Sequence, residues 1–448
     1  MRNNVQVRQR CVLNLLVVAL LVCGSTGSAW AGSLKRQMDG LFGPHGISIS
    51  RVEIPNAQGQ PVLHAAHFSD DSLLTLGTLV GTLAPSAADF PAVATVPGFT
   101  FRFDPQTQAF ERSSTSLGSV FVERPHTVGR GKFDVGASFL YVDFDELNGD
   151  SLDGYSLPPL HHDGFGPNLP PAQTFRKDFV SLSFPRFTLR SYVMSFSATY
   201  GITDRWDVNL LVPVVFTRFT LRAHAQIHNI GSAELGLGPD KNGIHFFDLP
   251  SRQLGRDYTL SDDKTGVGDL QLRTKYLLYR NEAENFAFAP GLTLRVPTGR
   301  ENDFQGLGDV TLTPNFSLAY EYGRFDFHLN SGVQINADDL DRSRVRYAGG
   351  ITFQLLDRIA LLTDLIGSSS MATQQITARA PKFGANGEPT GEFVSQTAGL
   401  RTDIIDFVVG LKAAPSDSIV FFFNCFLPLN NDGLRADFIP AAGVEVSF

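Results

Sequence analysis

Two adjacent histidines followed by an aspartate, at 161–163, are the best candidate metal ligands in this sequence. They lie in a loop rich in Pro and Gly, and no further His or Cys follows at the spacing that zinc sites use. The acidic stretch DFDELNGDSLDG at 143–154 fails as a calcium loop, because Leu147 stands where an EF-hand needs an oxygen ligand. A loose divalent site that bridges lipid phosphates is the alternative for this stretch. We predict no metal site and no cofactor.

Residues for hydrolysis or nucleotide binding are equally hard to find. The sequence contains no G-x-S-x-G motif, and the glycines of ELGLGPDKNG at 234–243 lack the strand-to-helix context of a nucleotide site. A membrane phospholipase would need a Ser–His pair at the outer, lipid-facing rim. His328 faces inward by its place in the strand pattern, and Ser331 is one residue off that face. We predict no catalytic residues and no enzyme activity, with a lipid hydrolase as the least favoured alternative.

Charged residues within alternating strands are the more informative candidates. In the second half of the chain, apolar residues recur at every second position, so the residues between them share the opposite face. Eleven charged side chains on that face would point into a lumen: Asp207, Asp269, Arg273, Lys275, Arg295, Glu321, Asp326, Asp364, Asp406, Lys412 and Glu445. Both signs of charge are present, so these residues can line a path for solutes or pair into a filled interior. The sequence leaves both possibilities open.

Strands position these side chains. From Tyr192 to Ile202 and from Trp206 to Phe216, large apolar residues alternate with small or polar ones. The same period of two recurs along the chain and gives twelve strands, at 131–144, 191–202, 206–217, 270–278, 286–296, 310–321, 325–335, 346–355, 359–367, 402–413, 419–428 and 438–448. Runs of about ten such residues are long enough to cross a bilayer when the strand is tilted.

Connections between these strands alternate in length, with short turns at one end and long loops at the other. This asymmetry is typical of outer-membrane barrels, whose short turns lie in the periplasm. The polar face carries mostly Ser, Thr, Gly and Asn rather than the Lys and Glu of a soluble sheet. Backbone groups in lipid must all be paired, so such a sheet must close. We predict an all-β fold, a transmembrane antiparallel up-and-down barrel of twelve strands, with a soluble β fold as the alternative.

The region before the barrel divides into two parts. Residues 1–31 are typical of an export signal, with three Arg, an apolar core at 12–22 and the cleavage sequence AWA at 29–31. Removing it would leave 34 basic and 45 acidic residues, a net charge of −11 that disfavours nucleic acid as a partner. Residues 32–130 lack long alternation, and we predict a lumen plug or periplasmic extension before a barrel at 131–448. Two more strands in residues 32–130 would make fourteen, and a further strand at 179–187 would lie within loop 145–189.

Four stretches resemble a known family: LGSVFVERPHTVGRGKFDVGASFLYVDFD (117–145), YGITDRWDVNLLVPVV (200–215), GVGDLQLRTKYLLY (266–279) and LRVPTGREN (294–302). They are similar to the outer-membrane β-barrel family known as the meta-pathway phenol-degradation family. That family looks like a relative of the long-chain fatty-acid and aromatic-hydrocarbon channels. The resemblance implies uptake of small hydrophobic compounds, and it carries no catalytic residues.

Two further residues have predicted roles. Pro213 lies in mid-strand, where it removes a ladder donor. In the fatty-acid channels that the family resembles, a broken strand opens a lateral exit, so we expect either such an opening or a simple bulge at Pro213. Phe448, preceded by alternating apolar residues, resembles the signal that the barrel-assembly machinery recognises.

The sequence thus predicts a channel in the cell outer membrane for small hydrophobic solutes, aromatic ones among them. The alternative is a closed structural or receptor-type barrel that acts through its extracellular loops. The expected partners are outer-membrane lipid and lipopolysaccharide, the barrel-assembly machinery and the solute itself. We expect a monomer that binds no nucleic acid.

Overall fold

A computed structural model of the chain describes residues 32–41, 47, 49–50, 52–55, 61–64, 83, 86–96, 101–104, 109–112, 116–162, 177–383 and 389–448. The predicted export signal at 1–31 lies outside these residues. Among the helices that are described, none is long and apolar enough to cross a membrane.

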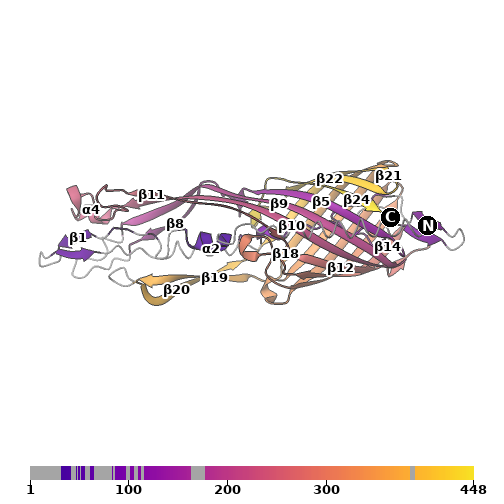
Figure 1. Ribbon diagram of the computed structural model, residues 1–448, viewed down its shortest axis with the longest axis horizontal. Helices are drawn as coiled ribbons and strands as arrows, with labels where there is room; N and C mark the ends of the chain where they lie inside the picture. The colour runs from indigo at the N-terminus through magenta and orange to yellow at the C-terminus, as the bar shows by residue number, and fades with distance from the viewer. Residues whose placement is uncertain are drawn as a thin grey trace.

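Twelve antiparallel strands close into a barrel (Figure 1). In order around the wall they are β5 (Phe133–Phe144), β9 (Phe179–Thr203), β10 (Trp206–His228), β12 (Leu270–Tyr276), β14 (Phe286–Val296), β15 (Thr311–Tyr322), β16 (Phe325–Asn336), β17 (Arg344–Leu356), β18 (Ile359–Ser370), β21 (Asp403–Ser416), β22 (Ile419–Pro428) and β24 (Ile439–Ser447). The seam closes where β24 pairs with β5, from Ala441 opposite Leu140 to Ser447 opposite Asp134. The twelve-strand prediction is confirmed, and the fourteen-strand alternative is wrong.

The alternation of the sequence decides which side chains face outward. On β16, Phe325, Phe327 and Leu329 are exposed on the outside, whereas Asp326 and His328 between them are buried. Leu329 keeps 50% of its surface exposed. Large apolar side chains exposed on every second residue around a closed sheet suit lipid as the surrounding solvent. The barrel is therefore that of an outer-membrane protein.

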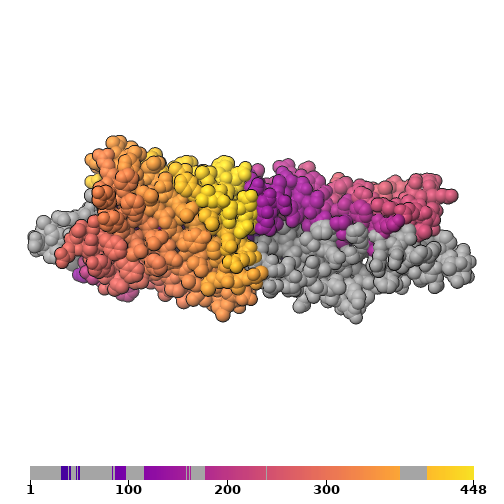
Figure 2. All heavy atoms as spheres, turned by 180° about the vertical axis from the view of Figure 1, so that it is seen from behind, coloured from indigo at the N-terminus to yellow at the C-terminus, as the bar shows by residue number. Residues whose placement is uncertain are grey.

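Two strands are about twice as long as the sequence predicted. β9 has 25 residues and β10 has 23, and they pair with each other beyond the barrel. β8 (Tyr155–His161) joins the outer part of β9, and β11 (Gly255–Val267) joins the outer part of β10. Figure 1 shows this extension projecting to the left of the barrel, and Figure 2 shows it from behind as a part narrower than the barrel.

The extension corrects two predicted long loops, the one at 145–189 and the one between the strands predicted at 206–217 and 270–278. The strand expected near 179–187 exists, but it is the first part of β9 and not an additional barrel strand. The same period of two continues there, since Val180, Leu182 and Phe184 are buried on one face. That face continues the hydrophobic core of the extension. An apolar face can thus be buried against protein as well as against lipid, and alternation by itself does not tell the two apart.

The remaining elements are short. The strands are β1 (Val52–Pro55), β2 (Pro61–His64), β3 (Phe101–Asp104), β4 (Ala109–Arg112), β6 (Glu146–Leu147), β7 (Asp150–Ser151), β13 (Tyr279–Arg280), β19 (Gln374–Phe383), β20 (Pro389–Leu400) and β23 (Leu434–Arg435). The helices are α2 (Leu34–Asp39), α4 (Gly231–Glu234) and the 3-10 turns η2 (Pro239–Lys241), η3 (Glu301–Asp303) and η4 (Leu340–Arg342). β19 and β20 form a separate hairpin in the connection between β18 and β21.

Residues 86–96 and 116–130, which we call the inner segment, run inside the barrel and contact inward side chains of several strands. Its two parts are tied together by Arg124, which is fully buried. The Arg124 guanidinium donates to the Val96 carbonyl at 3.0 Å and to the Ser116 carbonyl at 3.3 Å. Gly118 is required beside it, because a Cβ there would lie 2.4 Å from the Arg124 side chain. Whether the region at 32–130 acts as a plug stays a prediction.

Candidate functional site

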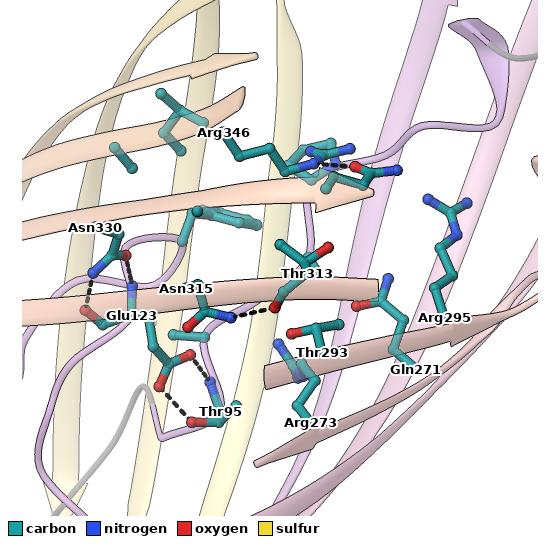
Figure 3. Close-up of a pocket in the computed structure, with 18 of the residues that line it drawn as sticks. Thr95, Glu123, Gln271, Arg273, Thr293, Arg295, Thr313, Asn315, Asn330 and Arg346 are labelled. Atoms are coloured by element: carbon teal, nitrogen blue, oxygen red, sulfur yellow. Dashed lines mark hydrogen bonds between the residues drawn. The ribbon is translucent and has the colours of Figure 1, made fainter. Parts of the chain in front are cut away.

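A cavity of about 240 Å³ lies in the lumen between the inner segment and the wall formed by β12 to β18 (Figure 3). Its wall side carries inward side chains of β12, β14, β15, β16 and β17, because these strands place every second residue on the inner face. Its other side is formed by residues 89–95 together with Phe121 and Glu123. The cavity is therefore a space that two separate parts of the chain create together.

Asp89 anchors the inner segment at one end of this cavity. Both of its carboxylate oxygens accept from Arg346 at 2.6 Å, and Arg295 donates to it at 3.2 Å. Arg344 lies 3.9 Å away. Arg295 is shared, because its Nε also donates to Asp269 at 2.9 Å. One buried carboxylate is thus surrounded by three guanidinium groups.

Glu123 anchors the other end. Lys275 Nζ donates to Glu123 at 2.7 Å and to the Arg124 carbonyl at the same distance. The Thr95 amide donates to the second carboxylate oxygen at 2.8 Å. Asn330 binds the Glu123 backbone at both its amide and its carbonyl, as Figure 3 shows. Every oxygen of this carboxylate therefore has a donor.

Arg273 lies between these two anchors. Its Nε donates to Asn209 at 2.8 Å, and its Nη1 donates to the Val93 carbonyl at 2.6 Å. The side chain is buried, and its Nη2 has no hydrogen-bond partner. Within the described part of the chain, no carboxylate lies within 4 Å of Arg273, in contrast to Arg295 and Arg346.

A second polar cluster lies nearer the short-turn end of the barrel. Lys412 is fully buried and donates to the carbonyls of Leu117 and Ser119, each at 2.9 Å. Ser119 in turn donates its hydroxyl to Asp364 at 2.6 Å, and Asp207 accepts from the Val128 amide at 3.0 Å. These contacts hold the inner segment against the wall at this end of the barrel.

Three of the eleven predicted lumen residues line the cavity, and the other eight lie elsewhere. Arg273, Lys275 and Arg295 line the cavity, and Asp269 holds Arg295. The other inward residues that are buried away from the cavity are Asp207, Asp326, Asp364, Lys412 and Glu445. Asp326 lies 3.3 Å from His328, and Asp406 pairs with Arg435 outside the cavity. Glu321 is half-buried on the inward face of β15. Their role as lining for a solute path stays a prediction.

Three charged residues of the cavity were not predicted: Asp89, Glu123 and Arg346. Arg346 could have been found from the sequence, because it lies in the strand predicted at 346–355 and on the same face as Thr352, which the structure shows to be buried. Asp89 and Glu123 carry no such signal, since the inner segment has no periodic structure. Their place follows only from long-range contacts with Arg295, Arg346 and Lys275.

Pro213 lies where one edge of β10 changes from pairing with β12 to pairing with β11. Residues Trp206–Leu211 pair with β12, and pairing with β11 begins at Val214. In between, the Gly268 amide donates to the Pro213 carbonyl at 2.8 Å, so the interruption is bridged by one hydrogen bond. On its other edge β10 pairs with β9 without a shift at Pro213. A lateral opening at this point stays a prediction.

Phe448 completes the seam next to the first barrel strand. Its amide donates to the Phe133 carbonyl at 2.9 Å, and its carbonyl accepts from the Phe133 amide at 2.8 Å. The two rings stack with centroids 6.0 Å apart. The predicted role of Phe448 as an assembly signal is separate from this pairing and stays a prediction.

The histidines of the extension form an internal cluster. The rings of His162 and His245 lie 5.0 Å apart, and His245 Nδ1 lies 3.0 Å from Asp178, which also accepts from the Gly231 and Ser232 amides. Burial raises the pKa of Asp178, but the bonds from His245 and Ser232 outweigh it and lower the pKa overall. Asp163 lies outside the described residues. In the part of the chain that is described, no group of three or more His, Cys, Asp or Glu could hold a metal ion.

Comparisons with solved structures return other β-barrels. The COG4313 outer membrane channel from Pseudomonas putida F1 is 15% identical, over 72% of this chain and 98% of that one, with a TM-score of 0.42. A FadL homologue from Pseudomonas aeruginosa is 7% identical, over 71% of this chain and 88% of that one, with a TM-score of 0.27. These scores are too low to carry an argument, so the fold assignment rests on the strand pairing. No match was found among curated proteins.

The family comparison covers part of the barrel and the extension. Residues 163–357 match the family described as "Putative MetA-pathway of phenol degradation". They include β9 to β17 and the part of the cavity wall that these strands form. The resemblance predicted from the sequence is confirmed over these residues, which are similar to that family.

Proposed function

We propose that this outer-membrane barrel is a channel for small hydrophobic solutes, aromatic ones among them, and that it has no catalytic activity. The cavity beside the inner segment is the observation that carries the proposal. It lies within the closed wall, where a solute crossing the membrane through the lumen would pass. Phe90, Val93 and Phe121 give it an apolar side.

The inner segment would control this passage. It is held by ion pairs at Asp89 and Glu123 and by hydrogen bonds such as those from Lys412, and not by strand pairing with the wall, so it can shift without opening the barrel. The barrel needs no partner subunit to close its sheet, which supports a monomer in contact with lipid and lipopolysaccharide.

Uptake by intact cells tests the proposal. Cells that lack the chain, and the same cells complemented with it, are given a radiolabelled aromatic solute at a concentration that limits growth. Complementation is expected to restore the initial rate of uptake. Equal rates in both strains, with the barrel present at normal levels in the complemented one, would rule the proposal out.

A closed barrel that acts through its outer parts is the second candidate. The buried ion pairs that fill the lumen and the long extension of β9 and β10 favour it. The two candidates differ in planar bilayers. Purified barrel should give stepwise currents if it is a channel, and none if the lumen stays closed.

A further inference from the structure

The cavity carries an excess of positive charge. Four cationic side chains line it, Arg273, Lys275, Arg295 and Arg346, against the two carboxylates of Asp89 and Glu123. Both carboxylates are already engaged. Asp89 pairs with Arg346 and Arg295, and Glu123 pairs with Lys275.

Arg273 is the cation that forms no ion pair with either carboxylate, although the charge of Glu123 is near enough to act on it. The two nitrogens that have partners donate to neutral oxygens, those of Asn209 and of the Val93 carbonyl. Nη2 has no partner, and only 7% of the residue is exposed. Burying a guanidinium without a direct ion pair is costly, and an anion bound beside it would lower that cost. The N–H groups of Nη2 can donate charge-assisted hydrogen bonds to a carboxylate, which are stronger than bonds to a neutral acceptor.

The rest of the lining indicates what kind of anion fits. The inner segment contributes Phe90, Val93 and Phe121, so the ligand must carry an apolar body as well as a charge. Thr293 lies opposite Arg273 on the neighbouring strand, and Thr293 and Asn315 both line the cavity and offer further polar contacts (Figure 3). At about 240 Å³ the cavity is smaller than the roughly 300–1,000 Å³ of clefts that hold drug-sized ligands. A compact molecule is therefore favoured.

We propose that the cavity binds a small organic carboxylate with a compact apolar body, and that Arg273 is the residue that binds its carboxylate group. The inference rests on the proposed channel function and sharpens it. The preferred solute is an amphipathic anion rather than a neutral hydrocarbon. Recognition would occur midway through the lumen, between the anchors at Asp89 and Glu123.

Binding to the purified full chain tests this directly. Equilibrium dialysis in detergent micelles would use radiolabelled benzoate as the probe, with benzyl alcohol as a neutral analogue of similar size and inorganic phosphate as an anion without an apolar body. We expect saturable benzoate binding that neither analogue displaces at tenfold higher concentration. Displacement by benzyl alcohol as effective as by unlabelled benzoate would overturn the role of charge. Equally effective displacement by phosphate would overturn the role of the apolar body.

Variants then test the residue. A hydrogen bond to a charged group is typically worth a factor of about 10 to 100 in affinity, so Arg273→Gln should weaken benzoate binding by that factor. Arg273→Lys should restore part of the loss because it keeps the charge. Arg358→Gln is the matched control, since Arg358 lies in the turn between β17 and β18 and its side chain is 54% exposed. Unchanged benzoate affinity in a folded Arg273→Gln barrel, judged by heat-modifiable gel migration, would refute the assignment.

Failure of this proposal and failure of the channel function give different results. If cells take up neutral aromatic solutes through the barrel but the purified chain binds no benzoate, the carboxylate site is wrong and the channel stands. If benzoate binds with the predicted dependence on Arg273 but complementation restores no uptake, the site stands and the channel is wrong.

Discussion

Replacing Asp89 with Asn should loosen the inner segment. The change removes the one carboxylate that Arg346 and Arg295 share at this end of the cavity, at 2.6 Å and 3.2 Å. Removing one partner of a buried ion pair costs about 3–5 kcal/mol when the other charge is left without a partner. Here Arg346 loses its carboxylate, whereas Arg295 keeps Asp269. Asn keeps the size of Asp and some of its hydrogen bonds, so we take the lower end of that range. At about 1.4 kcal/mol for each factor of ten, the population with a displaced segment should rise about 100-fold.

Single-channel recording in planar bilayers measures this population. Purified Asp89→Asn barrel is expected to open about 100-fold more often than the wild type, by the estimate above. The open state should also select anions more strongly, because one negative charge has left the lumen.

The control is a buried carboxylate elsewhere. Asp178 is fully buried in the extension and pairs with His245, away from the inner segment. Asp178→Asn should therefore leave the opening frequency unchanged. If Asp89→Asn behaves like this control, with both variants folded, the ion pairs at Asp89 do not hold the segment closed and the reasoning is refuted.

Three more predictions concern the barrel and its loops. Leu329→Arg, in the middle of β16 and facing outward, should lower the free energy of unfolding of the barrel in lipid by about 2–4 kcal/mol, measured by urea titration. Leu340→Arg, on the exposed turn η4, is the control and should change this free energy little. An equal effect of both would contradict a lipid-facing β16. Burial and the neighbouring Asp437 raise the pKa of Asp145 to about 6, so the folded state binds a proton that the unfolded state releases, and this contribution to stability is lost as the pH rises from about 4 to 6. Asp145→Asn should therefore raise the temperature of unfolding at pH 8 and not at pH 4; a gain of the same size at both values would show that the carboxyl is unperturbed. Phe448→Ala should lower the amount of folded barrel in the outer membrane, measured by surface labelling, and normal levels would show that Phe448 is no assembly signal.

The barrel was predictable because its signal is local. In each strand, apolar residues such as Phe325, Phe327 and Leu329 recur at every second position. The same pattern repeats around the wall, because each strand has lipid on one side and the lumen on the other. The extension was not predictable from the same signal. Val180, Leu182 and Phe184 alternate in the same way but are covered by protein, so the pattern could not say where the membrane ends.

The candidate site was predictable only in part, and the division is physical. Arg273, Lys275 and Arg295 lie on barrel strands, so parity placed them in the lumen. Asp89 and Glu123 belong to a segment without regular structure, whose position depends on partners about 150 to 260 residues away. Periodicity along the chain predicts which face of a strand a residue lies on. It does not predict which inward charged residue forms an ion pair with a distant loop.

The central claim is that solute crosses the lumen through the cavity, and a blocked cavity tests it most directly. Thr313 lines the cavity on β15, so Thr313→Cys in a Cys425→Ser background places a thiol in the cavity and leaves no other Cys outside the predicted export signal. Intact cells carrying this variant would be treated with a bulky, charged thiol reagent, and the uptake of a radiolabelled aromatic solute would be compared before and after labelling. If solute crosses at the cavity, uptake should fall toward the rate of cells without the barrel as labelling proceeds. Complete labelling of Thr313→Cys with an unchanged rate of uptake would contradict this claim.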